Sequence, residues 1–431
     1  MKWITSVIIA CLTGVLASSL AAGKDWPRFR GPNGSAVSED YDIPVTWSAT
    51  ENIVWRTALP GPGSSSPITT GGKVFLTCYT GYGIDTKSPG TVDKLERVLV
   101  CLNESTGAIL WEKSIKGAPG EDQVNRMLQL HGYASSTPAT DGERVYVLFG
   151  KAGVFAFDLD GNQLWRKSVG SGSAAMGFGS GASPIVYKNL VIVNAAAEDK
   201  AIYAFDGKTG NQVWKSPAAS LEGCWGTPVL VDVADGRQEL VISVPYEIWG
   251  FNPETGTFLW FAEGVKSNSA CASLVARDGI VYAVAGGPGG GGSVAVRAGG
   301  RDDVTKTNVL WNKSTSTYVP SPILVGDRLY WVNDEGIAYC LNRETGDTVY
   351  RQRISEAGTV YASLVAVGDK LYAVTRQKGT FVLEAGSKFN ELAHNELDED
   401  AGACNAGPAV SHGRLLLRSN KYLYCIGAKA K

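Results

Sequence analysis

The sequence has little histidine and methionine and lacks long apolar runs in its body. Three histidines and three methionines occur among 431 residues. No CxxC motif or Cys–His cluster is present, which excludes the common zinc and c-type haem motifs. Beyond the N-terminal region there is no run of about 18 apolar residues that would form a membrane-spanning helix. Lys and Arg total 40 against 42 Asp and Glu, a balance that gives no basis for binding nucleic acid.

The first residues form a candidate secretory signal. The segment "MKWITSVIIACLTGVLASSLAAG" combines a lysine, an apolar run and small residues, with cleavage expected after Ala21, Ala22 or Gly23. We assign residues 1–22 to a signal peptide and predict a periplasmic or secreted protein without a transmembrane segment in the mature chain. Lipid anchoring at Cys11 is not expected, because the apolar run continues past it. Seven cysteines remain, an odd number that leaves at least one thiol unpaired or bound to another molecule.

A glycine-turn hairpin that ends in a large aromatic residue recurs along the chain. "IYAFDGKTGNQVWKS" at 202–216 has counterparts that start at residues 99, 154, 248 and 338. In each copy an alternating strand leads to an Asp or Asn, a glycine turn and a second strand. The second strand carries the aromatic residue: Trp55, Trp111, Trp165, Trp214, Trp260, Trp311 and Tyr350, with Leu392 predicted at this position in the seventh unit.

A second hairpin follows each aromatic position and begins at a Ser/Thr-Pro step or its equivalent. "SSSPITTGGKVFLT" and "VPSPILVGDRLYWV" are two of eight copies. Each unit therefore has four antiparallel strands over about 40–55 residues, the period of propeller blades. The strand "NIVWRTAL" near the start and "KYLYCIG" at the end lack partners, and pairing them would close the ring without an open edge. We predict an all-β, eight-bladed propeller at 51–431 after a lead-in at 23–50.

The aromatic residue of each repeat is expected to dock one blade onto the next. A buried indole removes roughly 150–250 Å² from water, and the residue opposite it should be small. The predicted partners are Ala156, Ala204, Gly250, Cys101, Cys340 and Cys425. Three of the cysteines are therefore predicted to be packing residues rather than ligands or disulfide partners.

These repeats resemble the tryptophan-docking repeat of the quinoprotein superfamily, eight-bladed propellers with PQQ-like repeats in the wider class of WD40/YVTN-like repeats. The resemblance covers essentially the whole mature chain, and "DWPRFRGPNGS" at 25–35 is similar to the lead-in of exported bacterial members. The superfamily includes PQQ-dependent alcohol and glucose dehydrogenases and also a non-enzymatic propeller lipoprotein of the outer-membrane protein assembly machinery. The resemblance therefore implies the fold and leaves two classes of function open.

Candidate binding residues lie in the loops that precede the innermost strands, which form one face of a propeller. They are Arg126, His131, Tyr133, Phe178, Trp225, Tyr318, Tyr361 and Asn405. Longer loops at 79–96, 116–135 and 285–293 are expected on the same face. The aromatic residues could instead plug the channel, and His131 could serve loop carbonyls. No Ser–His–acid set, carboxylate pair or metal site is recognisable, so no catalytic or metal-binding residue is assigned.

No cofactor is predicted, with PQQ and calcium as the alternative. Holding PQQ requires two stacking surfaces, cations for its three carboxylates and usually a Ca²⁺ ion. The resemblance implies that alcohol dehydrogenases use a disulfide of adjacent cysteines as one surface, whereas sugar-oxidising relatives do not. Here no two cysteines are adjacent, and Arg126 is the one evident cation near the mouth. The sequence favours a binding or scaffold protein for an envelope or extracellular protein, peptide or glycan over a PQQ-dependent alcohol or sugar dehydrogenase.

Overall fold

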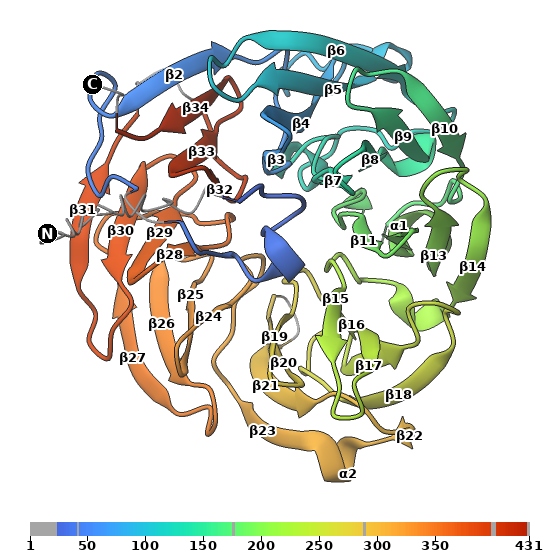
Figure 1. Ribbon diagram of the computed structural model, residues 1–431, viewed down its shortest axis with the longest axis vertical. Coiled ribbons are helices and arrows are strands. Elements are labelled where there is room, and N and C mark those ends of the chain that lie inside the picture. Colours follow the sequence, from blue (N-terminus) through green and yellow to red (C-terminus); the bar gives the residue numbers. More distant parts are fainter. Residues whose placement is uncertain (1–23, 41–42, 175–176, 288–289, 398–401, 429–431) are drawn as a thin grey trace, which may run out of the picture.

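Eight antiparallel sheets are arranged as blades in a ring around a central axis (Figure 1). The computed structural model describes residues 24–40, 43–174, 177–287, 290–397 and 402–428. The predicted signal peptide at 1–22, including Cys11, lies outside the described residues. The predicted eight-bladed β-propeller is confirmed. In the described part of the chain no helix is long and apolar enough to cross a membrane.

The first four blades follow one another along the chain, each running from the innermost strand to the outermost. Blade 1 contains β3 (Ile68–Thr70), β4 (Lys73–Thr80), β5 (Glu96–Asn103) and β6 (Ile109–Lys116); blade 2 contains β7 (Ala139–Thr140), β8 (Arg144–Leu148), β9 (Val154–Asp158) and β10 (Gln163–Lys167). Blade 3 contains β11 (Ile185–Tyr187), β12 (Leu190–Ala195), β13 (Ala201–Asp206) and β14 (Gln212–Pro217); blade 4 contains β15 (Val229–Asp232), β16 (Gln238–Val244), β17 (Glu247–Phe251) and β18 (Phe258–Glu263).

The remaining blades repeat this order. Blade 5 contains β19 (Val275–Arg277), β20 (Ile280–Ala285), β21 (Gly292–Arg297) and β23 (Val309–Lys313); blade 6 contains β24 (Ile323–Val325), β25 (Arg328–Val332), β26 (Ile337–Asn342) and β27 (Thr348–Arg353). Blade 7 contains β28 (Val365–Val367), β29 (Lys370–Val374), β30 (Thr380–Glu384) and β31 (Glu391–Asn395); blade 8 contains β32 (Ala409–Ser411), β33 (Arg414–Arg418), β34 (Tyr422–Ile426) and β2 (Ile53–Ala58). Two short strands, β1 (Val37–Ser38) and β22 (Asp302–Asp303), add in parallel to β28 and β18. The helices are single turns, α1 (Ala196–Asp199) and α2 (Thr305–Asn308), with short 3₁₀ segments at Pro32–Gly34, Val92–Lys94, Leu128–Leu130, Gly150–Ala152 and Ala219–Leu221.

The ring closes as the unpaired terminal strands predicted. Strand β2 pairs antiparallel with β34, which places Trp55 opposite Cys425 and Ala58 opposite Tyr422. The N-terminal strand therefore supplies the outermost strand of the last blade, and the eighth sheet has its full set of four strands.

The docking aromatics lie opposite small residues in every register that the sequence predicted. Trp111 faces Cys101, Tyr350 faces Cys340 and Trp214 faces Ala204, each next to a one-residue bulge in the outer strand. The indole covers the turn glycine of the following blade: a Cβ added to Gly107 would lie 2.5 Å from Trp55. The seven cysteines in the described part are free thiols, so Cys101, Cys340 and Cys425 serve as packing residues.

The seventh blade departs from the prediction. Leu392 is the bulged residue and is 40% exposed, while Ala393 takes the docking position opposite Val382. The assignment of Leu392 was wrong because most blades carry an exposed apolar residue at the bulge, such as Leu110, Leu164 and Leu310, which mimics the docking residue in sequence. Blade 7 has Trp47 of the lead-in instead, whose ring packs on Tyr372 with centroids 6.2 Å apart.

The lead-in crosses the centre of the ring (Figure 1) and bonds to inner strands of several blades. The amide of Thr69 in blade 1 donates to the carbonyl of Trp26 at 2.9 Å. The Arg30 guanidinium is buried and donates to backbone carbonyls just before blades 5 and 6, at Leu274 and Pro322. The amide of Ala366 in blade 7 donates to Ala36. The lead-in is thus part of the propeller core.

A ladder of hydroxyl groups runs around the channel where the inner strands begin. Seven blades take part through the Ser or Thr of the Ser/Thr-Pro step or its equivalent. The backbone N–H of this residue in one blade donates to the side-chain Oγ of the equivalent residue in the next blade, at 2.9–3.0 Å. The ladder runs Ser66, Thr137, Ser183, Thr227, Ser273, Ser321 and Ser363. In blade 8 the equivalent residue is Gly407, and the ladder stops there.

Completing the ladder with Gly407→Ser is expected to raise the free energy of unfolding by about 1 kcal/mol. The added hydroxyl can form a hydrogen bond, which contributes about 0.5–1.5 kcal/mol. Replacing glycine also restricts the unfolded chain, so less conformational entropy is lost on folding. A Cβ on Gly407 would lie 3.9 Å from the Ser363 amide nitrogen and 3.5 Å from Ser66 Oγ, without a clash. Urea unfolding measures the change. Gly326→Ser is the control, because Gly326 has open space but a φ of +59°. No gain for Gly407→Ser over wild type would contradict the prediction.

Candidate functional site

A cavity of about 210 Å³ lies at the mouth of the central channel. We call it the central chamber. Each of the connections that precede the eight inner strands contributes to its wall, and Phe29 of the lead-in also lines it. The wall side chains above the hydroxyl ladder are mostly apolar or aromatic: Met127, Leu130, His131, Phe178, Trp225, Cys271, Tyr318, Val319, Tyr361 and Asn405. In the described lining there is no Asp, Glu, Lys or Arg, so the chamber is neutral.

The structure brings six of the eight sequence-predicted site residues together in this chamber, among them His131 and Asn405. The His131 ring contacts Ser135 Oγ through Nδ1 at 2.5 Å and the Phe178 carbonyl through Nε2 at 2.7 Å. Burial lowers the pKa of His131, which favours a neutral ring that donates to the carbonyl. His131 therefore joins two connections, as the loop-carbonyl interpretation anticipated.

The aromatic walls are held in place by contacts outside the chamber. Trp225 donates from Nε1 to the Gly179 carbonyl at 2.9 Å and meets the Phe178 ring edge to face, with centroids 5.4 Å apart. The Arg376 guanidinium lies 5.3 Å from the Tyr361 ring centroid. Burial raises the pKa of Tyr318 to about 12, so its hydroxyl stays neutral. These rings form a fixed apolar surface.

One polar atom in the chamber wall is unsatisfied. Asn405 donates from Nδ2 to the Leu130 carbonyl at 2.9 Å, whereas its Oδ1 is buried without a hydrogen-bond donor among the described residues. A buried acceptor without a donor is unfavourable by about 1–3 kcal/mol. This oxygen could accept a hydrogen bond from a guest in the chamber.

Two predicted site residues do not line the chamber. Arg126 is exposed on the 116–135 connection. Tyr133 is buried, donates from its hydroxyl to the Asp122 carbonyl at 2.7 Å, and lines a different cavity. Arg126 and Tyr133 are separated from His131 in space although they are close to it in sequence, and the 3₁₀ turn Leu128–Leu130 lies within this stretch.

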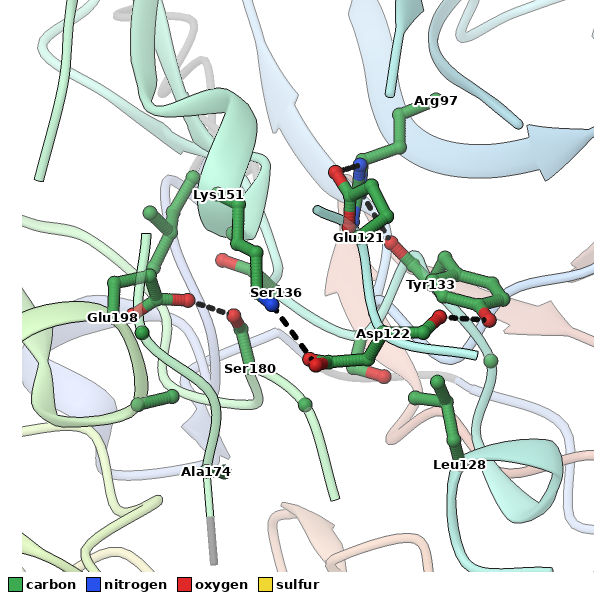
Figure 2. Close-up of a pocket in the computed structure, with 17 residues that line it drawn as sticks. Arg97, Glu121, Asp122, Leu128, Tyr133, Ser136, Lys151, Ala174, Ser180 and Glu198 are labelled. Atoms are coloured by element: carbon green, nitrogen blue, oxygen red, sulfur yellow. Dashed lines mark hydrogen bonds and ion pairs between the residues drawn. The ribbon is translucent and has the colours of Figure 1, made fainter. Parts of the chain in front are cut away.

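The second cavity is small, about 30 Å³, and its walls are polar (Figure 2). We call it the polar cavity. Arg97 on β5 forms a two-pronged ion pair with Glu121, with Nη–Oε distances of 2.6 and 2.8 Å, and both side chains are buried. Lys151 forms an ion pair with Asp122 at 2.9 Å. These pairs join the connection after blade 1 to blades 1 and 2.

Glu198 on α1 is a second buried carboxyl group of the polar cavity, and Ser180 donates a hydrogen bond to it (Figure 2). Burial raises the pKa of Glu198 above its usual value, partly offset by that hydrogen bond. In the described residues Glu198 forms no ion pair, so its protonated form is favoured relative to a solvated glutamate. The side chains around the polar cavity connect blades 1, 2 and 3 to one another, and the cavity itself is too small for a sizeable ligand.

The chamber does not fit PQQ and calcium, the cofactor pair that the resemblance implies. Three ligand carboxylates would enter a wall that, in its described residues, has no cation to compensate them. The same wall has no carboxylate to bind Ca²⁺, which prefers six to eight oxygen ligands. Trp225 offers one stacking surface. The geometry of the chamber is that of a neutral, aromatic binding site.

Fold and site together define an eight-bladed, tryptophan-docked propeller with PQQ-like repeats. The chain belongs to the family described as outer membrane protein assembly factor BamB, which matches residues 94–352. It is 24% identical over 422 residues to the outer membrane protein assembly factor BamB of Burkholderia pseudomallei, covering 86% of this chain and 96% of that protein.

Other relatives are more distant in length or sequence. The chain is 27% identical over 297 residues to the tetrathionate hydrolase of Acidithiobacillus ferrooxidans, covering 62% of this chain and 53% of that protein, so it matches only about half of that relative's length. The crystal structure of BamB from Moraxella catarrhalis has a TM-score of 0.60 at 14% identity, covering 88% of this chain and 98% of that chain. The crystal structure of the computationally designed Ika8 protein has a TM-score of 0.58 at 12% identity, covering 90% of this chain and 100% of that chain. Both structures support the fold.

Sequence reasoning missed Phe29, Met127 and Leu130 in the chamber, and Arg97, Lys151 and Glu198 in the polar cavity. The lead-in and the long connections have no counterpart in the repeat, so their paths could not be read from it. The base of the chamber did have a signal, because the Ser/Thr-Pro step recurs in register around the ring.

Proposed function

We propose that this protein is an exported binding or scaffold protein whose chamber-bearing face receives an apolar segment of an envelope or extracellular protein. The observation that carries the proposal is the neutral, aromatic chamber at the channel mouth. Such a concave apolar surface with a few polar groups is the usual form of a binding site. Its aromatic walls are the residue types that dominate binding energy at interfaces.

Two further features support a protein partner on this face. Ile84, in the long loop between β4 and β5, is 54% exposed, and Tyr246, in the turn between β16 and β17, is 53% exposed. Both connections lie at the same end of the blades as the chamber. The relatives named BamB are, by that name, outer membrane protein assembly factors, which favours an envelope partner over a small substrate.

The alternative, a PQQ-dependent alcohol or sugar dehydrogenase, has less support. The described chamber lining lacks both cations for PQQ and carboxylates for Ca²⁺. The thiol that faces the chamber is unsuited to nucleophilic chemistry at neutral pH, because burial raises the pKa of Cys271 to about 11.

The test compares binding by wild type and by a chamber variant, Phe178→Ala/Tyr361→Ala. A partner cross-linked to wild type in the envelope fraction is purified, and its dissociation constant is measured with each protein. We expect the chamber variant to bind at least about 10-fold more weakly, since aromatic anchors often contribute 1–2 kcal/mol or more. The control is Phe258→Ala, which removes a 45% exposed ring from the outer strand of blade 4.

Equal affinity for wild type and the chamber variant would overturn the proposal. So would turnover by the purified protein: it is titrated with PQQ and Ca²⁺, and dye reduction is followed with alcohols and aldoses. Substrate-dependent dye bleaching would assign the dehydrogenase function instead.

A further inference from the structure

Three side chains of metal-ligand type converge where the ring closes, on the face opposite the central chamber. Asp25 belongs to the lead-in, Glu104 to the turn between β5 and β6 of blade 1, and His412 to the turn between β32 and β33 of blade 8. One ligand atom from each lies within 4.8 Å of the others. Residues near both ends of the chain thus contribute to one cluster, which no motif or residue spacing in the sequence predicted.

The carboxylates of this cluster are incompletely paired. Glu104 is 5% exposed, and its Oε1 lies 3.1 Å from His412 Nδ1. Asp25 accepts a hydrogen bond from the Gly71 amide through Oδ2 at 3.2 Å, but its Oδ1 is shielded from solvent and has no donor among the described residues. An enclosed carboxylate oxygen without a donor is unfavourable. A cation at this point would supply the missing partner and offset the repulsion between the two carboxylates.

The donor set selects the kind of cation. Zn²⁺ and related divalent transition-metal ions accept imidazole and carboxylate together, whereas Ca²⁺ and Mg²⁺ prefer oxygen alone. Two ligands each about 2.1 Å from a tetrahedral ion lie roughly 3.4 Å apart, close to the 3.1 Å between Glu104 Oε1 and His412 Nδ1. We propose that Asp25, Glu104 and His412 bind one divalent transition-metal ion of the zinc type.

The surroundings suit a structural ion with access from solvent. The His412 side chain is 44% exposed, which gives an entry path and leaves the fourth position to water. The Glu104 turn is fixed by its backbone, whose carbonyl accepts the Trp55 indole N–H at 2.9 Å. Thr69 Oγ1 donates to Ser411 Oγ, which lies 2.9 Å from His412 Nδ1. The lone pair of Nδ1 serves either the Ser411 hydroxyl or the ion, so metal binding replaces this contact. The ion would join the lead-in to the first and last blades, independently of what the chamber binds.

The test uses the full-length, untagged protein after treatment with a chelator, with ZnCl₂ as the probe. We expect one ion per chain by isothermal titration calorimetry. At a hundredfold excess over the dissociation constant, Tm should rise by roughly 2–5 °C, because the ion binds the folded state alone. Co²⁺ in place of Zn²⁺ should give the visible absorption of a tetrahedral site with nitrogen and oxygen ligands.

The variants are His412→Asn and Glu104→Gln. Asparagine tolerates the left-handed backbone of position 412, where φ is 51°, so the turn should be retained. Each variant should bind Zn²⁺ at least about 10-fold more weakly and lose the Tm rise. His394→Gln, an exposed histidine on β31, is the matched control and should behave as wild type. The proposal is overturned if wild type shows no Zn²⁺-dependent rise in Tm, or if both variants bind as tightly as wild type.

Discussion

Arg97→Met is expected to lower the free energy of unfolding by about 3–5 kcal/mol, because it leaves the buried Glu121 carboxylate without its partner. Both side chains are about 95% buried, with 5% and 4% exposure. Arg97 also donates from Nε to the Tyr133 carbonyl at 3.0 Å. The substitution therefore unties the 116–135 connection from blade 1. Urea unfolding followed by tryptophan fluorescence measures the loss.

The companion variant removes both charges. Arg97→Met/Glu121→Leu should recover most of the lost stability, since an apolar pair can replace a buried ion pair at little cost. The control is Lys24→Met, which breaks an ion pair with Glu39 whose side chains are 69% and 77% exposed and should change stability only slightly. Equal losses for Arg97→Met and the control would show that the buried pair contributes no more than a surface pair.

Trp165→Ala should cost about 3–5 kcal/mol, the usual range for truncating a buried aromatic side chain. The Trp165 indole donates to the Gly207 carbonyl of the next blade at 2.9 Å and covers Gly210, where an added Cβ would meet the ring at 2.7 Å. The neighbouring Leu164, at the bulge, is 46% exposed. Leu164→Ala is therefore the matched control, with an expected change of less than about 0.5 kcal/mol.

Thermal and urea unfolding of both variants test this difference. Adjacent residues of one strand should differ several-fold in effect, because one docks two blades and the other faces water. Similar losses at the two positions would mean that docking is not what holds the blades together.

The repeat made the fold predictable, since every feature that it encodes is local or strictly periodic. Strand alternation, turn glycines and small residues opposite the aromatics all recur in register, and the two unpaired terminal strands revealed the closure. Asp206 and Asn252 accept hydrogen bonds from their own turn amides as expected. The docking residue of the seventh blade was mispredicted because that position holds Ala393. The missing aromatic packing is supplied by Trp47, a residue outside the repeat.

The site was only partly predictable. Residues directly before an inner strand, such as Trp225 and Tyr361, reach the chamber because the propeller places every such position at the mouth. Tyr133 has a similar position in sequence, but its ring packs between Tyr79 and Tyr82, at centroid distances of 5.5 and 5.8 Å. The long loop at 79–96 contributes Tyr82, and no repeat specifies how that loop folds back. The direction of a side chain in an irregular connection depends on such non-periodic neighbours.

The path of the lead-in also determines when the molecule can become complete. The Trp47 amide donates to Asn395 Oδ1, which is 348 residues further along the chain. At about 5–20 residues per second, a ribosome needs roughly 20–70 s to make the partner after the lead-in. Throughout that interval Trp26 and Trp47 lack their final packing, and β2 is an unpaired edge, a feature prone to aggregation. The segments made first are among the last to be buried. The nascent chain therefore exposes an aggregation-prone N-terminal segment until its final blade has been synthesised.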